Sequence, residues 1–146
     1  KELESNPIMG TIGKVMDAAF IDRDDPASAV ESLHKMEELA RNGLSILIAP
    51  EGTRSRTGEL GPFKLGPMHL AVASHAPLVP MIVAGSARCM PHGQLWSRPG
   101  TVLVEFLPPI DTRDYSLDNL RQRADDLRAL FLAEIHRLEA ELPGPP

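Results

Sequence analysis

The sequence predicts an α/β domain with a mostly parallel sheet flanked by helices. Short apolar runs recur along the chain, and segments with apolar residues at helical spacing lie between them. This alternation is typical of domains in which helices connect the strands of a largely parallel sheet. The length of 146 residues, with 42% hydrophobic and 24% charged residues, fits a single globular domain.

The first elements precede residue 49. Residues 7–17 predict a short helix or a turn, because two glycines interrupt the pattern. Residues 18–22 (AAFID) form a short apolar run that predicts a strand. Residues 44–48 (LSILI) are apolar almost throughout, which predicts a strand that is buried on both faces.

A helix is expected between these two strands. Asp24 or Asp25 can cap its first turn, and Pro26 suits the first helical position. Apolar residues then recur at helical spacing until Asn42–Gly43, a pair that commonly ends a helix.

The second half of the chain repeats the alternation of helix and strand. Residues 66–74 predict a second short helix, and residues 78–84 and 101–107 predict two further strands. The segment between them, residues 85–100, is rich in Gly, Pro and Ser and is expected to be a loop.

The last predicted element is a long helix that Ser116 can cap. Its polar face mixes Arg and Glu, which favours packing on the sheet over a membrane-surface or coiled-coil role. Residues 143–146 (PGPP) are expected to form a tail, so the predicted domain covers residues 1–142. The apolar stripe of the helix consists of Leu117, Leu120, Ala124, Leu127, Phe131, Leu138 and Leu142.

Composition narrows the possible functions. The net charge of -5 argues against a general nucleic-acid partner, so any anion binding must be local. The single Cys89 excludes an internal disulfide and an all-Cys metal site. Because His, Cys and carboxylate residues are not clustered at metal-ligand spacing, no metal is expected. No apolar run approaches the roughly 20 residues of a membrane span.

The charged, glycine-rich stretch at residues 49–66 (APEGTRSRTGELGPFKLG) follows a predicted strand directly. In open α/β sheets, ligands bind beyond the carboxyl ends of strands, and the end of the 18–22 strand belongs to the same rim. Arginine presents a planar fork of donors suited to phosphate, glycine admits close backbone approach, and a carboxylate accepts from hydroxyls. The expected rim residues are Arg23, Glu51, Gly52, Thr53, Arg54 and Lys64.

These residues predict a pocket for a phosphorylated polyol. The alternative is a solvated charged loop with internal ion pairs, and the residues alone do not decide between the two. The loop has neither a Walker A sequence nor a G-x-G-x-x-G fingerprint, so a nucleotide is not expected.

The same stretch resembles a known family. PEGTRS at residues 50–55 resembles the third sequence block of the glycerolipid acyltransferases, which include the 1-acylglycerol-3-phosphate acyltransferases and their glycerol-3-phosphate relatives. The segments FIDR, FKLG and LVPMIVAGS, at residues 20–23, 63–66 and 78–86, resemble neighbouring blocks in the same order. The resemblance extends from Lys1 to about Ser86.

The resemblance implies roles for individual residues. Arg23 and Arg54 would contact the phosphate of the acyl acceptor, and Glu51 and Gly52 its glycerol part. Thr53 belongs to the same block, and Lys64 and Lys1 are weaker candidates for the same electropositive pocket. Pro80 would shape the acyl-donor side of the site. Pro80 is also explained as a proline at a strand edge or bulge, and both interpretations can hold together.

The first block of the family, H-x-x-x-x-D, supplies the general base that takes the proton from the acceptor hydroxyl. None of the five histidines has an aspartate at that offset. In the family this block lies upstream of the segment that KEL at residues 1–3 resembles, so the resemblance implies that the base lies upstream of Lys1. His34 and His136 are expected at the surface of helices, and His69 and His75 near the pocket.

The resemblance therefore implies an enzyme of phospholipid synthesis. It would move a fatty acyl chain from acyl-CoA or acyl-carrier protein, as co-substrate, to lysophosphatidic acid, forming phosphatidic acid without another cofactor. The alternatives are a glycerol-3-phosphate or other lysophospholipid acyltransferase, or a module that binds lipid phosphates without catalysis. This chain alone is expected to be inactive.

A lipid acceptor implies peripheral attachment at the cytoplasmic face of a membrane. Trp96 lies in a Gly/Pro-rich loop where an exposed aromatic can meet the interface, and the favoured alternative is that it packs against the sheet. The candidate contact residues are Phe63, Leu65, Met68, Met90, Leu95 and Trp96.

Overall fold

The computed structural model describes residues 26–53, 55, 57–94 and 96–144. The chain divides into two compact units, Lys1–Ile46 and Leu47–Pro146. The predicted strand at residues 18–22 and the capping residues Asp24 and Asp25 lie outside the described residues. The single domain predicted for residues 1–142 stays a prediction.

The first unit contains α2, which spans Pro26–Arg41 and confirms the predicted helix. Its end has the hydrogen bonds of a Schellman motif, in which the Leu44 N–H donates to the Leu39 carbonyl and the Gly43 N–H to the Ala40 carbonyl. Gly43 has a φ of 84°, a left-handed conformation that glycine adopts without strain. The Asn42–Gly43 signal therefore ends the helix as predicted.

The strand predicted at residues 44–48 is wrong. The structure assigns no strand there, and the side chains of Leu44 and Leu47 are 51% and 79% exposed. A strand exists only through hydrogen bonds to a neighbouring strand, and the sheet formed by the described residues contains β1 and β2 alone. An apolar run without such a neighbour does not become a strand.

The second unit begins with the loop described below and continues into α3, Gly66–Ser74. This helix has the predicted boundaries. Pro67 stands in its first turn, where a missing N–H is tolerated, and Met68 and Ala71 are buried on one side. The helix ends at His75, whose φ of 52° is left-handed and whose N–H donates to the Ala71 carbonyl.

The sheet consists of β1, Met81–Ala84, and β2, Leu103–Phe106. The two strands are antiparallel, with Met81 opposite Phe106 and Ala84 opposite Leu103. The mostly parallel arrangement is therefore not present in the described sheet. A parallel pair needs a crossover across the face of the sheet, and the connection here holds only α4, the single turn Ser86–Cys89, within the predicted loop.

A bulge lies next to this pair of strands. Leu78 and Ile110 form an isolated bridge, so that Val79 and Pro80 face the three residues 107–109. Proline has no N–H to donate, but the Pro80 carbonyl accepts a hydrogen bond from the Leu107 N–H at 2.9 Å. Pro80 is buried at this position, as expected for a proline at a bulge.

The last element is α5, Leu120–Glu141, which confirms the long helix but begins later than predicted. Its N-cap is Asn119 rather than Ser116. The Asn119 side chain is engaged before the helix: its Oδ1 accepts from the Ser116 N–H, and its Nδ2 donates to the Asp114 carbonyl. The turn at Ser116 is thus closed by a side chain that lies after it in the sequence.

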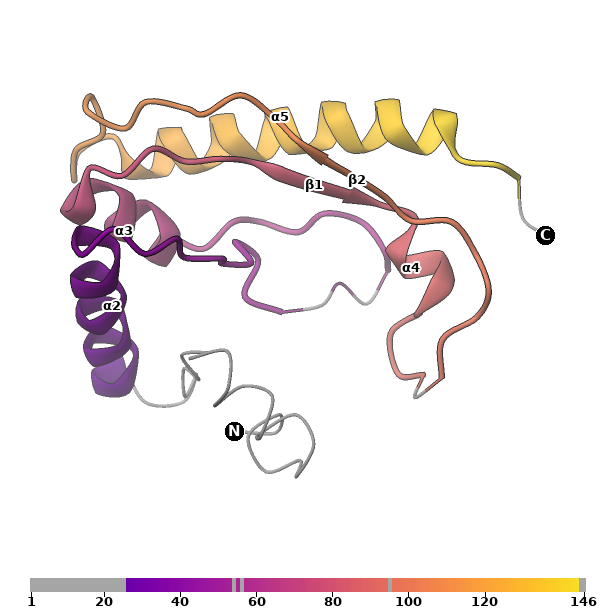
Figure 1. Cartoon of the computed structure of the whole chain (residues 1–146), viewed down its shortest axis with the longest axis horizontal. Helices are drawn as coiled ribbons and strands as arrows, with labels where there is room; N and C mark the ends of the chain where they lie inside the picture. The colour runs from indigo at the N-terminus through magenta and orange to yellow at the C-terminus, as the bar shows by residue number, and fades with distance from the viewer. Residues whose placement is uncertain (1–25, 54, 56, 95, 145–146) are drawn as a thin grey trace. The chain divides into compact units, whose positions relative to one another are not determined.

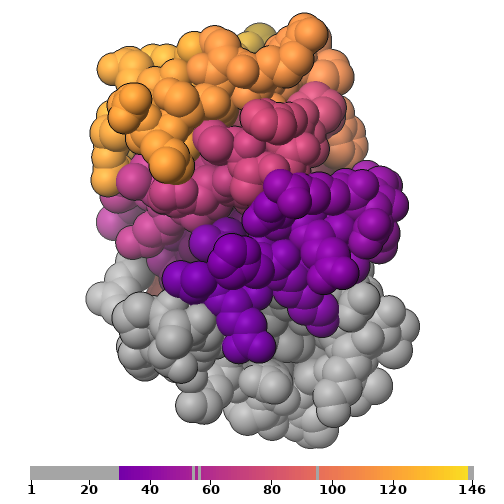
Figure 2. Space-filling model, turned by 90° about the vertical axis from the view of Figure 1, so that its left-hand side faces the viewer, coloured from indigo at the N-terminus to yellow at the C-terminus, as the bar shows by residue number. Residues whose placement is uncertain are grey.

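Two apolar clusters join α5 to the rest of this unit. Near its first turns, Leu120, Ala124 and Leu127 pack with Phe63, Met68 and Ala71 around α3. Farther along, Leu138 packs with Ile82 and Ala84 of β1. Figure 1 shows α5 running alongside β1 and β2, and Figure 2 looks onto the end where α3 and the start of α5 lie. The helix therefore packs on the sheet as predicted.

Within the described part of the chain, none of the helices is both long enough and apolar enough to span a membrane.

Candidate functional site

The PEGTRS sequence lies in a closed loop, residues 50–64, which we call the 50–64 loop. Its two ends meet where the Lys64 N–H donates to the Pro50 carbonyl at 2.8 Å. At the start, the Gly52 N–H donates to the Ala49 carbonyl, and Gly52 has a left-handed φ of 70°. A surface loop of this size with adjacent ends is an Ω-loop, a form that often carries functional side chains.

Glu51 reaches back across the 50–64 loop. Its Oε2 accepts a hydrogen bond from the Gly61 N–H at 2.8 Å, in a partly buried position. A Cβ atom on Gly61 would lie 3.0 Å from this oxygen, so a glycine allows the carboxylate to approach the backbone. The direction of the Glu51 side chain is therefore set by a peptide group ten residues later.

Two hydroxyl groups hold the exposed tip of the loop. The Ser55 Oγ accepts from the Gly58 N–H at 3.0 Å, and the Thr57 Oγ1 accepts from the Glu59 N–H at 3.3 Å. The two hydroxyls are 3.4 Å apart. Ser and Thr commonly form such local turns, in which the side-chain oxygen accepts a hydrogen bond from a nearby backbone N–H.

Arg128 of α5 holds the same loop from the other side. Its Nε donates to the Gly61 carbonyl and its Nη2 to the Leu60 carbonyl, both at 2.8 Å. The Arg128 side chain is partly buried. Arg128 is not among the site residues that the sequence predicts. The available signal was spacing, since Arg128, Leu132 and His136 are four residues apart and share one helix face.

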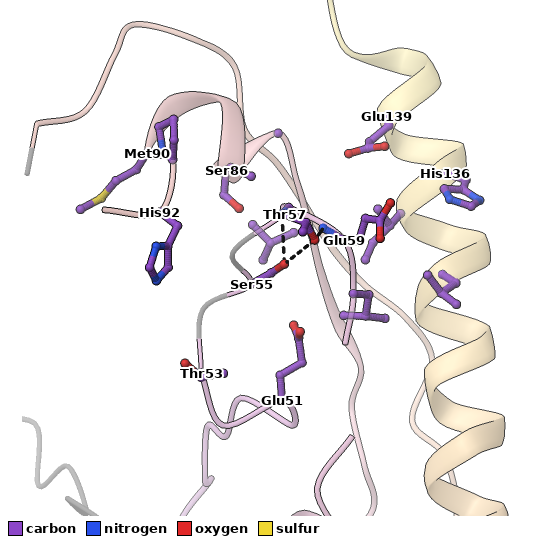
Figure 3. Close-up of a pocket in the computed structure, with 18 of the residues that line it drawn as sticks. Glu51, Thr53, Ser55, Thr57, Glu59, Ser86, Met90, His92, His136 and Glu139 are labelled. Carbon is purple, nitrogen blue, oxygen red and sulfur yellow. Dashed lines mark hydrogen bonds between the residues drawn. The ribbon is translucent and has the colours of Figure 1, made fainter. Parts of the chain in front are cut away.

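The loop, α4 and this face of α5 surround a cavity of about 720 Å³. Figure 3 shows Glu51 and Thr53 approaching it from the loop, Ser86 and His92 from the α4 side, and His136 and Glu139 from α5. Glu51 is thus placed at a pocket large enough for a small-molecule substrate. The labelled lining residues are Glu51, Thr53, Ser55, Thr57, Glu59, Ser86, Met90, His92, His136 and Glu139.

The structure brings some of the predicted site residues together. Glu51 and Thr53 line the cavity, and Gly52 lies between them in the chain. Lys64 closes the loop through its backbone, and a Cβ on Gly52 would lie 3.7 Å from the Lys64 Cγ. Neither the Lys64 side chain nor Pro80 is among the lining residues. Arg23, Arg54 and Lys1 lie outside the described residues.

The described lining carries more negative than positive charge. It includes the carboxylates of Glu51, Glu59 and Glu139 and the guanidinium of Arg128. A phosphate at this cavity would therefore need positive charge beyond that of the described lining residues. Among the described residues, no group of three or more His, Cys, Asp or Glu side chains could hold a metal ion.

His136 is exposed on α5, as expected, and it also lines the cavity together with His92. His69 and His75, which were expected near the cavity, are instead exposed on and just after α3 and are not among its lining residues. The reason is that α3, which carries His69, packs against the first turns of α5, whereas the cavity lies beside the later turns of α5.

Some of the apolar residues predicted to contact a membrane are exposed, and others are buried. Phe63 and Met68 are 3% and 1% exposed and belong to the core, so they are wrong as contact residues. Trp96 is 83% exposed and Met90 45% exposed, so the alternative that Trp96 packs against the sheet is also wrong. Leu65 is partly buried, and Leu95 lies outside the described residues.

Comparisons with known proteins agree with the motifs. The family model described as Acyltransferase matches residues 1–84. The 1-acyl-sn-glycerol-3-phosphate acyltransferase of Limnanthes douglasii is 40% identical over 121 residues, which are 82% of this chain and 43% of that protein. The protein of the same name from Salmonella typhimurium is 34% identical over 93% of this chain and 55% of its own length. This chain thus spans about half the length of the curated relatives it matches.

A solved structure gives the same result for the fold. The 1-acyl-sn-glycerophosphate (LPA) acyltransferase PlsC from Thermotoga maritima superposes with a TM-score of 0.75, at 24% identity, over 96% of this chain and 55% of that one. The acyltransferase-like α/β fold is therefore confirmed, although the described strands are antiparallel. Since the family model covers more than half of the sequence and includes the 50–64 loop with its cavity-lining glutamate, the chain belongs to the Acyltransferase family.

Proposed function

We propose that the protein to which this chain belongs transfers a fatty acyl group from a thioester donor to lysophosphatidic acid, forming phosphatidic acid. The acceptor hydroxyl oxygen bonds to the thioester carbonyl carbon, the carbon–sulfur bond breaks, and the hydroxyl proton passes by way of a base to the thiol product. The observation that carries this proposal is Glu51, held by Gly61 at the rim of the cavity within the PEGTRS loop.

The proposed roles follow from the chemistry of the residues. The Glu51 carboxylate accepts hydrogen bonds from hydroxyls of the glycerol part of the acceptor. Arg23 and Arg54 bind the phosphate, with Lys64 and Lys1 adding charge nearby. Gly52 and Thr53 present backbone and hydroxyl groups at the rim, and Pro80 supports the acyl-donor side through the bulge that it forms with residues 107–109.

The general base is proposed to lie in a part of the protein outside these residues. An alcohol is barely ionised near neutral pH, so the reaction needs a base at the hydroxyl. The sequence holds no H-x-x-x-x-D motif. The chain also spans only 43% of the Limnanthes relative, which leaves room for such a segment. The donor is acyl-CoA or acyl-carrier protein, and no further cofactor enters the proposed reaction.

The proposed location is the cytoplasmic face of a membrane, with peripheral attachment. The acceptor and the product are lipids, so the enzyme must meet a bilayer to exchange them. Exposed Trp96 and Met90, of which Met90 lines the cavity, support this location, because aromatic and apolar side chains favour the membrane interface.

The test is a Glu51→Gln substitution in the full-length protein. The variant keeps an oxygen for Gly61 but loses the charge, so we expect kcat/KM for lysophosphatidic acid to fall about 10- to 100-fold, as for a charge-assisted hydrogen bond. Steady-state assays with acyl-CoA and with acyl-carrier protein would measure this. Glu31→Gln, an exposed carboxylate of α2, is the matched control.

A panel of acceptors separates the alternatives. If transfer to glycerol 3-phosphate or to another lysophospholipid is faster than transfer to lysophosphatidic acid, that compound replaces lysophosphatidic acid as the proposed acceptor. Binding of lipid phosphate without transfer to any acceptor would favour the non-catalytic module. Equal activity of Glu51→Gln and the control would remove Glu51 from the proposed role.

A further inference from the structure

Arg128 and Glu51 hold opposite ends of one peptide group. The peptide between Leu60 and Gly61 offers its carbonyl to Arg128 Nη2 and its N–H to Glu51 Oε2, each at 2.8 Å. The following carbonyl, that of Gly61, receives Arg128 Nε. Two hydrogen bonds through one peptide group therefore connect Arg128 to the Glu51 carboxylate, and the third holds the next carbonyl.

This chain of contacts has the chemistry of a clamp. The guanidinium places two donors in a rigid plane, and adjacent backbone carbonyls can accept both at once. A charged donor on the carbonyl also polarises the peptide group and strengthens its N–H as a donor to the carboxylate. All three bonds lie in partly buried surroundings, where hydrogen bonds are stronger than in water.

We infer that Arg128 is a positioning residue, which holds the 50–64 loop so that Glu51 meets the acceptor. The identity of the ligand in this inference rests on the proposed function, whereas the contacts of Arg128 do not depend on it. Arg128 lies at residue 128, outside the residues 1–84 that match the family model, so the family motifs do not include it. Its contacts span 67 and 68 residues of sequence.

The conservative variant Arg128→Lys tests this role. Lysine keeps the charge at the cavity but offers one compact donor group, so it cannot hold two adjacent carbonyls in the same plane. We expect the KM for the acceptor to rise about tenfold, as for the loss of one well-placed hydrogen bond, with the donor KM unchanged and kcat within about threefold. Arg121→Lys, on the exposed face of the same helix, is the matched control.

A direct contact of Arg128 with the phosphate predicts a different result. A point charge serves such a contact, so Arg128→Lys would retain acceptor binding while Arg128→Ala would lose it. That outcome would overturn the positioning role.

A double-mutant cycle shows whether Arg128 acts through Glu51. If it does, adding Arg128→Lys to Glu51→Gln will raise the acceptor KM little beyond the effect of Glu51→Gln alone. If the KM of the double variant rises by the product of the two single effects, the inference is contradicted, because the free energies of independent contacts add.

Hydrogen exchange of the Gly61 amide provides a readout that does not depend on activity. In the ligand-free full-length protein, Arg128→Lys should speed exchange at Gly61 about tenfold or more, since Arg128 holds the peptide group whose N–H donates to Glu51. Arg121→Lys should leave it unchanged. Unchanged exchange in Arg128→Lys would overturn the positioning role even if the enzyme were active. An inactive wild type with faster exchange in the variant would instead count against the proposed function alone.

Discussion

At the scale of single residues, Gly85 is the described glycine with the least space for a Cβ atom. It follows β1, has a φ of 83°, and a Cβ there would lie 2.5 Å from the Thr101 carbonyl oxygen and 3.0 Å from Leu142 Cδ1. The strand therefore turns into α4 at a site where both conformation and space require glycine.

We expect Gly85→Ala to lower the free energy of unfolding by about 2–4 kcal/mol, combining left-handed strain with a clash that backbone atoms must relieve. Gly93→Ala is the matched control, because Gly93 has a φ of 80° but nothing within 4 Å of its Cβ position. Urea unfolding of both variants would separate strain from clash. Equal losses in the two would show that the surroundings of Gly85 yield easily.

At the scale of elements, α5 depends on a small contact with β1. Leu138 is 3% exposed and packs with Ile82 and Ala84, while the mixed-charge face of the helix adds Arg137, which pairs with Glu105 of β2 at 2.6 Å. This ion pair is exposed to solvent and contributes little, so the apolar contact carries the packing of the helix on the sheet.

We therefore expect Leu138→Ala to lower the free energy of unfolding by about 2–4 kcal/mol, from lost burial and the cavity left behind. Leu117→Ala changes the same side chain at a position that is 69% exposed and should shift stability by less than about 0.5 kcal/mol. Chemical denaturation followed by circular dichroism would measure both. A loss below 1 kcal/mol for Leu138→Ala would mean that the end of α5 is held by other contacts.

Elements also show how far the sequence predicts this fold. The boundaries of α3 and the end of α2 were predictable, because Pro67 and Asn42–Gly43 act through local backbone geometry. The pairing of β1 with β2 was not, since an apolar run has the same pattern in a parallel and in an antiparallel sheet. Direction is decided by the connection between strands, where α4 is too short for a crossover.

At the scale of the whole molecule, membrane attachment is the proposal with the widest consequence. The Arg98 N–H donates to the Cys89 carbonyl at 2.7 Å, which closes the loop carrying Trp96. Trp96 and Met90 are exposed on it, with the exposed cations Arg88 and Arg98 at its base. This arrangement suits contact with a lipid interface by apolar burial, with a modest electrostatic part.

In flotation of the full-length protein with anionic liposomes, Trp96→Ala should lower the partition coefficient about tenfold, from the loss of buried aromatic area. Raising the salt concentration should have a smaller effect, because the chain has a net charge of -5 and only a local cationic patch. Leu117→Ala removes another exposed apolar side chain, 69% exposed, elsewhere and serves as the control. Unchanged flotation of Trp96→Ala would show that other parts of the protein attach it to the membrane.

The candidate site shows the same limit of prediction at this scale. Glu51 and Thr53 were identified from a motif whose chemistry is local, and the structure places both at the cavity. Arg128 was missed because its role depends on two carbonyls that are 67 and 68 residues away. Spacing along α5 indicates which residues share a face but not what that face contacts.

The Arg128 clamp also affects the order in which the protein is built. During synthesis the 50–64 loop leaves the ribosome well before Arg128, so the loop emerges without the side chain that fixes its backbone. The carboxylate of Glu51 can take its final direction only after α5 has formed and docked. The most recognisable sequence of this chain is therefore translated before the side chain that fixes its backbone, and it reaches its working geometry only after that side chain has docked.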